Sequence, residues 1–235
     1  MVRLRPMTSY LVSTYGRAVR IINAGAIQRL CAVSAAIGLV LILSVLPVVA
    51  DDKPVIVAFG DSLSAGYGLD DAESFPVRLE VALRAAGLAA QVVNAGVSGD
   101  TTAGGLARLD WSLPERVDLV ILELGANDGL RGIDPAETEA NLDAILKTLG
   151  KRNIPVLFTG MLAPPNLGRQ YADAFDALFP RLAARHAVVF YPFFLEGVAA
   201  ERSLNQPDGI HPNPAGVDRI VMRLLPFVLR ALDAG

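Results

Sequence analysis

A serine near the start of this chain, and a histidine with an aspartate beside it near the end, have side chains suited to covalent chemistry. Ser62 stands in the glycine-rich stretch FGDSLSAGYG, residues 59–68, directly after the apolar run PVIVA. In DGIH, a glycine lets the chain curl, so that Asp208 can meet one ring nitrogen of His211 while the other ring nitrogen faces the serine. A serine hydroxyl is a weak nucleophile and needs such a base. The pattern indicates a Ser-His-Asp triad, although a turn aspartate and a helix-capping histidine explain Asp208 and His211 equally well when each is taken alone.

Attack by a serine on a carbonyl carbon also requires hydrogen-bond donors for the oxyanion that forms. Three candidate donors are the backbone N–H of Ser62, the backbone N–H of Gly99 in VSGD, and the side-chain amide of Asn127 in GAND. A glycine tolerates the loop conformation that points its N–H inward. An asparagine amide is a neutral donor that does not compete as a base. The alternatives are a turn glycine at position 99 and an Asn-Asp turn at position 127.

The pattern of apolar residues predicts the elements that would position these groups. Near-continuous apolar runs of strand length indicate strands that are covered on both faces, as in a parallel sheet. We expect these strands at Val55–Phe59, Gln91–Asn94, Leu119–Leu124, Val156–Gly160 and Val188–Tyr191. We expect helices between and after them at Phe75–Ala86, Thr102–Ser112, Thr138–Leu149, Tyr171–Arg185 and Pro214–Leu232. This alternation predicts an α/β fold, a three-layer αβα sandwich around a five-stranded parallel sheet.

Binding sites in such sheets form beyond the carboxyl ends of the strands. The candidate residues follow the predicted strands in that way: Ser62 follows the first, Gly99 the second and Asn127 the third. The fourth strand leads into the apolar stretch MLAPPNLG, residues 161–168, and the fifth leads, after a longer connection, to Asp208 and His211. The topology therefore predicts one shared site at this edge of the sheet. Four residues of the apolar stretch are predicted to bind substrate: Met161, Leu162, Pro164 and Leu167.

Four stretches, FGDSLSAGYG, NAGVSGDTT, LGANDGLRG and DGIHPN, resemble in order the sequence blocks of the SGNH (GDSL) hydrolase family. The chain looks most similar to the bacterial periplasmic thioesterase/lysophospholipase/arylesterase subgroup, from about residue 54 to residue 229. The resemblance implies a flavodoxin-like fold and hydrolysis of esters and often thioesters without a cofactor. It also implies roles for matching residues. By this resemblance, Ser62 would be the nucleophile, Gly99 and Asn127 would complete the oxyanion hole, and Asp208 and His211 would complete the triad.

The N-terminal fifty residues have a different composition from the rest of the chain. Residues 1–29 carry five arginines and no acidic residue, and the 21 residues from Leu30 to Ala50 are uncharged. A basic region, an apolar region and small residues at Val48 and Ala50 predict a secretory signal peptide over residues 1–50. The alternative is an uncleaved membrane anchor, which would be the chain's only membrane contact. We therefore expect a single hydrolase domain, residues 51–235, in the periplasm or secreted, or anchored at the inner membrane.

The composition of residues 51–235 excludes several classes of function. They contain 16 basic and 24 acidic residues with no basic cluster, which argues against nucleic-acid binding. The only cysteine, Cys31, lies in the N-terminal segment, so a thiol nucleophile is excluded. With two histidines and no HExxH motif, metal-dependent hydrolysis is disfavoured, and we expect neither a metal nor a cofactor. We expect a monomer whose partners are small ester, thioester or lipid substrates.

Two other functions remain open at this point. The same fold could serve a deacetylase acting on polysaccharides or small molecules, although the apolar residues after the fourth strand favour an acyl chain over a sugar. A flavodoxin-like module could instead bind flavin or a nucleotide, but the first loop lacks both GxxxxGK[ST] and GxGxxG.

The remaining polar residues near the predicted site have structural interpretations. Asp61, Asp100, Asp128 and Glu123 are expected to hold their loops in place. His186 is expected at the C-terminus of a helix, on the opposite edge of the sheet from Ser62. For Arg108 and Arg131 we expect solvated surface positions, with contact to a charged substrate as the alternative.

Overall fold

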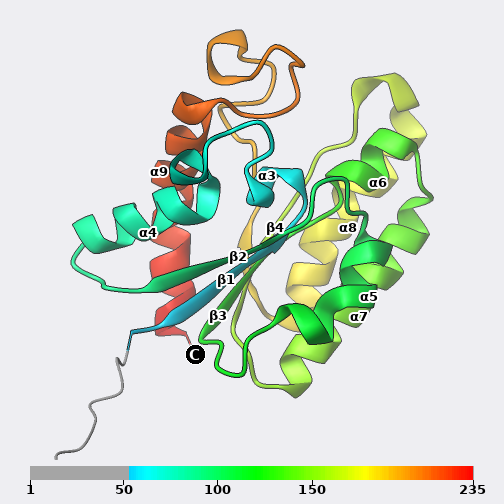
Figure 1. The fold of residues 1–235 in the computed structure, drawn as a ribbon. Helices are drawn as coiled ribbons and strands as arrows, with labels where there is room; N and C mark the ends of the chain where they lie inside the picture. The colour runs from blue at the N-terminus through cyan, green and yellow to red at the C-terminus, as the bar shows by residue number, and fades with distance from the viewer. Residues whose placement is uncertain (1–52, 235) are drawn as a thin grey trace, which may run out of the picture. The chain divides into compact units, whose positions relative to one another are not determined.

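The computed structural model describes residues 53–234, in which five strands form one parallel sheet (Figure 1). Their order across the sheet is β2-β1-β3-β4-β5. The strands are β1 (Val55–Gly60), β2 (Gln91–Gly96), β3 (Leu119–Glu123), β4 (Val156–Thr159) and β5 (Val189–Tyr191). The predicted five-stranded parallel sheet is thus confirmed, and each predicted strand overlaps an observed one.

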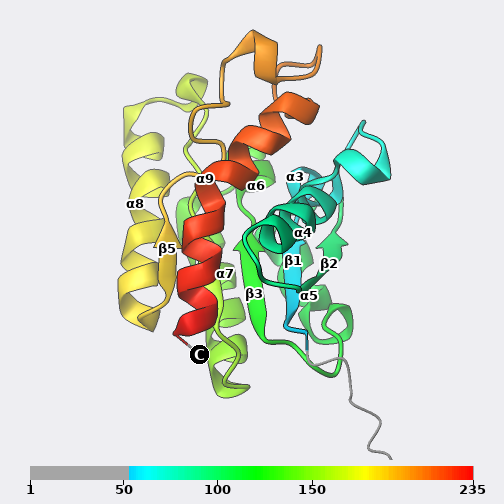
Figure 2. The same cartoon turned by 90° about the vertical axis from the view of Figure 1, so that its left-hand side faces the viewer.

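Helices cover both faces of this sheet, as predicted for a three-layer sandwich. The long helices are α4 (Phe75–Ala85), α5 (Thr102–Ser112), α7 (Pro135–Lys151), α8 (Arg169–His186) and α9 (Pro214–Asp233). Figure 1 and Figure 2 show α4 and α9 together on one face, and α5, α7 and α8 on the other. The last helix begins with a cap, since the Asn213 side chain accepts the N–H of Gly216 and Pro214 occupies the first turn.

The core lies on both sides of the central strands. All five residues of β3 are buried, and so are five of the six residues of β1. This double burial explains why these strands are apolar throughout and do not alternate. Aromatic side chains fill much of the space under α8, where Phe158, Phe175 and Phe179 are buried and in ring contact. The continuous apolar runs of β1 and β3 therefore match their position in the middle of the sheet, between two layers of helices.

Two short helices, α3 (Ser62–Ala65) and α6 (Ala126–Arg131), occupy positions where the sequence predicted loops. They begin just beyond β1 and β3, the two strands between which the chain changes its direction of winding. After β1 the chain forms β2 on one side, and it then crosses to form β3 on the other side. Because the connections leave in opposite directions, a cleft opens at the carboxyl ends of β1 and β3.

The predicted signal peptide or anchor, residues 1–50, lies outside the described residues. From Lys53 onward the chain forms one compact unit. Within residues 53–234, no helix combines the length and apolar character that a membrane span requires.

Candidate active site

Ser62 is the first residue of α3 and follows β1 with one residue between them. That residue, Asp61, caps the helix by accepting the N–H of Leu63 at 3.0 Å. The helix ends after four residues at Gly66, whose φ of 83° is a left-handed conformation that suits glycine. Asp61 and Gly66 thus limit α3 to a single helical turn directly after β1. The partly buried Ser62 side chain at its start faces a cavity.

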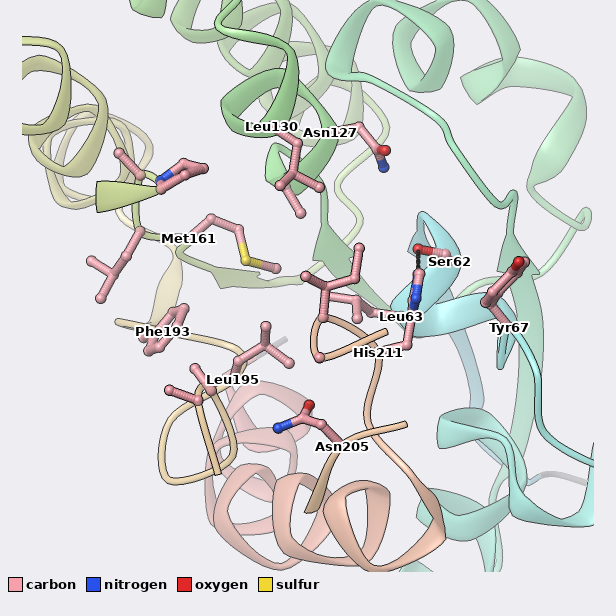
Figure 3. Close-up of a pocket in the computed structure, with 18 of the residues that line it drawn as sticks. Ser62, Leu63, Tyr67, Asn127, Leu130, Met161, Phe193, Leu195, Asn205 and His211 are labelled. Atoms are coloured by element: carbon pink, nitrogen blue, oxygen red, sulfur yellow. Dashed lines mark hydrogen bonds between the residues drawn. The ribbon is translucent and has the colours of Figure 1, made fainter. Parts of the chain in front are cut away.

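The structure brings Ser62, His211 and Asp208 together in one chain of hydrogen bonds. The Nε2 atom of His211 lies 2.9 Å from Ser62 Oγ (Figure 3). The Nδ1 atom of the same ring lies 2.7 Å from Asp208 Oδ2. The other carboxylate oxygen of Asp208 accepts the backbone N–H groups of Ile210 and His211. The hydrogen bond from His211, followed by those backbone bonds, lowers the pKa of Asp208 to about 2. An ionised Asp208 accepts a hydrogen bond from the Nδ1–H group of His211, which leaves Nε2 without a proton and able to accept one from Ser62.

The loop that carries His211 is tied to the loop after α3. Gln206 donates its backbone N–H to His211 O at 2.8 Å and its side-chain amide to Tyr67 O at 2.7 Å. The Tyr67 ring packs on the imidazole, with ring centroids 4.5 Å apart. Sequence reasoning missed both Gln206 and Tyr67, because nothing in either local sequence shows that they meet.

Gly99 and Asn127 line the same cavity as Ser62. Gly99 has a φ of 84°, a conformation that a residue with a side chain rarely adopts, so the turn after β2 requires glycine here. Asn127 is the second residue of α6, and Figure 3 shows its side chain on the same side of the cavity as Leu130, facing Ser62 across the opening. The structure therefore gathers all five residues predicted for the triad and the oxyanion hole at one edge of the sheet, namely Ser62, Gly99, Asn127, Asp208 and His211.

The cavity beside Ser62 has a volume of about 690 Å³ and a largely apolar wall. In Figure 3, Met161, Phe193 and Leu195 lie on one side of Ser62, and Tyr67 lies on the other. Of the four residues predicted to bind substrate, Met161, Leu162 and Pro164 line the cavity. Leu167 does not line it, because the 3₁₀ turn Pro165–Leu167 carries that side chain toward Gly132. Further lining residues, beyond the predicted four, include Leu130, Leu195, Ala199, Asn205 and Ile210.

Residues 58–219 match the GDSL-like lipase/acylhydrolase family. The chain belongs to this family. The esterase TesA of Pseudomonas aeruginosa is 41% identical over 172 residues, which are 73% of this chain and 86% of the relative. The thioesterase 1/protease 1/lysophospholipase L1 of Escherichia coli K12 is 40% identical over 178 residues, 74% of this chain and 84% of the relative.

A solved structure shows the same similarity. AlinE4, described as an SGNH-hydrolase family esterase, matches with a TM-score of 0.66 at 50% identity, covering 78% of this chain and 98% of AlinE4. Together these matches confirm the predicted SGNH hydrolase family and its α/β fold, and with them the prediction that the chain is an ester hydrolase.

In this SGNH hydrolase, Arg108 lies inside the molecule, so the expectation of a solvated surface position was wrong. The residue is 5% exposed and forms an ion pair of 2.6 Å with Asp100. Its guanidinium also donates to the carbonyl oxygens of Gly60 and Ala95, and it stacks 4.1 Å from the centroid of the Phe59 ring. Arg108 therefore ties the ends of β1 and β2 together beneath the site, and it is not among the residues that line the cavity.

Asp128 and Arg131 hold neighbouring parts of the site in place. The buried carboxylate of Asp128 accepts the N–H and hydroxyl of Thr102 and the hydroxyl of Thr138, which joins α6 to α5 and α7. The exposed Arg131 side chain donates to Gly99 O at 2.7 Å. Asp128 thus has a structural role, as expected from the sequence, although it joins three helices and does not hold a loop. Arg131 is exposed, as expected, and it also supports the turn that contains Gly99.

Beneath Ser62 lie two fully buried carboxyl groups, Asp61 and Glu123. Burial is the main cause that raises the pKa of Asp61 to about 6. Burial, followed by the nearby Asp61 carboxylate, raises the pKa of Glu123 well above its ordinary value. Both effects favour the protonated form of the Glu123 carboxyl group.

His186 ends α8 at the other edge of the sheet, and its Nε2 atom lies 2.8 Å from Asp143 Oδ1. This agrees with its structural interpretation. Over residues 53–234, no three His, Cys, Asp or Glu side chains are arranged as a metal site.

Proposed function

We propose that this SGNH hydrolase cleaves carboxylic esters and acyl thioesters, including lysolipids, through an acyl-enzyme on Ser62. The observation that carries the proposal is the continuous hydrogen-bonded chain from Ser62 through His211 to Asp208. Substrate classes enter from the relatives, which are named as an esterase and as a thioesterase and lysophospholipase.

In the proposed reaction, Ser62 Oγ attacks the acyl carbon while His211 Nε2 takes the hydroxyl proton. Ionised Asp208 holds the imidazole in the correct tautomer and stabilises the imidazolium that forms. The oxyanion is stabilised by the N–H groups of Ser62 and Gly99 and by the Asn127 amide. His211 then protonates the leaving group, and a water that His211 activates hydrolyses the acyl-enzyme.

The shape of the cavity supports an acyl chain as the group that lies beside Met161 and Phe193. This region is largely apolar, and it borders Ser62. Burial of a methylene contributes about 0.8 kcal/mol, so each added carbon should raise kcat/KM up to about four-fold until the cavity is full. The leaving group would then depart past the half-exposed Tyr67.

The test is a panel of aryl esters, acyl thioesters and lysolipids of graded acyl length, with Ser62→Ala and Ser64→Ala as a matched pair. Ser64 is buried and donates to Glu123 at 2.8 Å, so it serves as the neighbouring serine outside the triad. Ser62→Ala should lower kcat on the order of a million-fold, while Ser64→Ala retains hydrolysis. A phosphonate should label Ser62. Labelling of Ser64, or a sharp preference for acetyl esters over all longer chains, would contradict the proposal, and the latter would favour a deacetylase.

We also propose that the enzyme acts in the periplasm or outside the cell. The support is the arginine-containing segment and the uncharged run before residue 51. Cell fractionation with N-terminal sequencing tests this. A mature start near residue 51 in the soluble periplasmic or extracellular fraction is expected, and an intact chain in the cytoplasm would contradict it.

A further inference from the structure

Asp61 precedes the proposed nucleophile directly, is fully buried, and has no role in the proton transfers described above. Its backbone N–H donates to Glu123 Oε2 at 3.2 Å, and the same oxygen accepts the Ser64 hydroxyl. A methyl group on Gly60 would overlap the side chains of both Ser64 and Glu123, so the chain has no spare room at this strand end. The Asp61 backbone is therefore held in place by its hydrogen bond to Glu123 and by the tight packing of Gly60 against Ser64 and Glu123.

Both carboxylate oxygens of Asp61 are also engaged. One oxygen, Oδ1, accepts the N–H of Leu63 at 3.0 Å. The other, Oδ2, accepts the side-chain NH₂ of Asn127 at 3.0 Å, across 66 residues of sequence. Asp61 thus joins the turn that carries Ser62 to the helix that carries Asn127.

We propose that Asp61 is a positioning residue that holds the Asn127 amide with its NH₂ group, and not its carbonyl oxygen, toward the oxyanion. This inference rests on the proposed role of Asn127 as an oxyanion donor. The two ends of an asparagine amide are nearly equal in size but opposite in hydrogen bonding, so its neighbours decide which end faces a site. An ionised carboxylate only accepts hydrogen bonds, and it therefore selects the NH₂ end. One N–H of that group binds Asp61, and the second N–H remains available for the oxyanion.

The substitution Asp61→Asn reverses this selection. The Leu63 N–H still requires an acceptor, so the new side chain keeps its carbonyl oxygen there and turns its own NH₂ toward Asn127. Asn127 must then present its carbonyl oxygen to that NH₂. The flipped amide places an oxygen where the oxyanion forms, and a donor is exchanged for a repulsive lone pair.

The experiment measures kcat and KM on one short aryl ester at pH 8, where Asp61 with a pKa of about 6 is ionised. The variants are D61N, N127A and the double variant. The control is D118N, the same substitution at a carboxylate away from the site. In the wild type, Asp118 accepts the Val55 N–H at 2.7 Å where β1 begins. D61N and N127A should each lower kcat about 10²- to 10³-fold with KM within two-fold of the wild type. The double variant should be no slower than N127A alone, because Asp61 acts through Asn127. D118N should keep the wild-type kcat.

A kcat of D61N within three-fold of the wild type overturns the proposal. A loss of kcat in the double variant that equals the product of the losses in D61N and N127A also overturns it. If D61N does not fold, D61S replaces it, since serine can still cap the Leu63 N–H but offers Asn127 no carboxylate. D61S should lower kcat about ten-fold in the wild-type background and not at all in the N127A background. A wild-type kcat for N127A would instead remove Asn127 from the proposed mechanism, an outcome distinct from failure of the Asp61 proposal alone.

Discussion

Replacing Leu162 by aspartate should shorten the range of acyl chains that the enzyme accepts. Leu162 lies on the cavity wall and is 51% exposed, so about half of its side chain remains for a substrate to cover. Full burial of a leucine contributes about 1.5–3 kcal/mol, and half of that is about 1 kcal/mol. This corresponds to about five-fold in kcat/KM for a chain long enough to cover the residue. An aspartate removes that contribution and adds a charge that an alkyl chain must desolvate.

The assay compares kcat/KM for acetyl and octanoyl aryl esters. Leu162→Asp should lower the octanoyl-to-acetyl ratio at least about five-fold, with little change in acetyl activity. Leu167→Asp is the matched control, because it is the same substitution five residues along the same loop at a side chain outside the cavity. Its ratio should equal that of the wild type, even if its stability changes. Equal ratios for Leu162→Asp and the wild type would refute the idea that the acyl chain lies along this wall.

Three further results are expected. Asp208→Asn should lower kcat about 10⁴-fold, as seen for triad aspartates elsewhere. The amide keeps its oxygen on the N–H groups of Ile210 and His211 and turns its NH₂ to Nδ1, which places the ring proton on Nε2, the wrong tautomer for a base. Rates of ester hydrolysis check this, and a loss of kcat below ten-fold contradicts it. Glu123→Gln should remove one source of pH dependence from the stability. The folded-state pKa of Glu123 is raised well above its ordinary value of 4.5, so the contribution of this group to the free energy of unfolding falls as pH rises above that value. In urea unfolding, the glutamine variant should therefore gain stability relative to the wild type as the pH rises above about 5. Parallel wild-type and variant profiles would argue against a raised pKa of Glu123. Dialysis against EDTA should leave ester hydrolysis unchanged, and a loss that a divalent ion restores would point to a metal site.

Much of the fold could be predicted because buried strands and long helices leave long-range patterns in the sequence. All five strands and the five long helices were placed this way, and the rule that sites follow strand ends brought Ser62 and His211 to one edge. The short helices α3 and α6 were not predicted, since four and six residues are too few to show a helical period.

Contacts between distant residues were the other features that the sequence did not reveal. Arg108 looked like a surface residue because its partners, two carbonyl oxygens and Asp100, come together only when the strands are aligned. Leu167 looked equivalent to Leu162, but a single 3₁₀ turn reorients it. The bond from Gln206 to Tyr67 spans 139 residues and leaves no local signal.

The hydrogen bond between Ser62 and His211 joins residues 149 positions apart. During synthesis, His211 is therefore added to the chain well after Ser62. At roughly 5–20 residues per second of synthesis, the base emerges from the ribosome roughly 7 to 30 seconds after the nucleophile. Until His211 is present, Ser62 lacks the base to which it is hydrogen-bonded in the folded chain, so the growing chain should not hydrolyse esters. We expect hydrolysis only after α9 has packed against α4 and the loop that precedes α9 has reached Tyr67. The appearance of esterase activity is therefore a measure of completed folding, and two separately expressed fragments divided between β3 and β5 should become active only upon association.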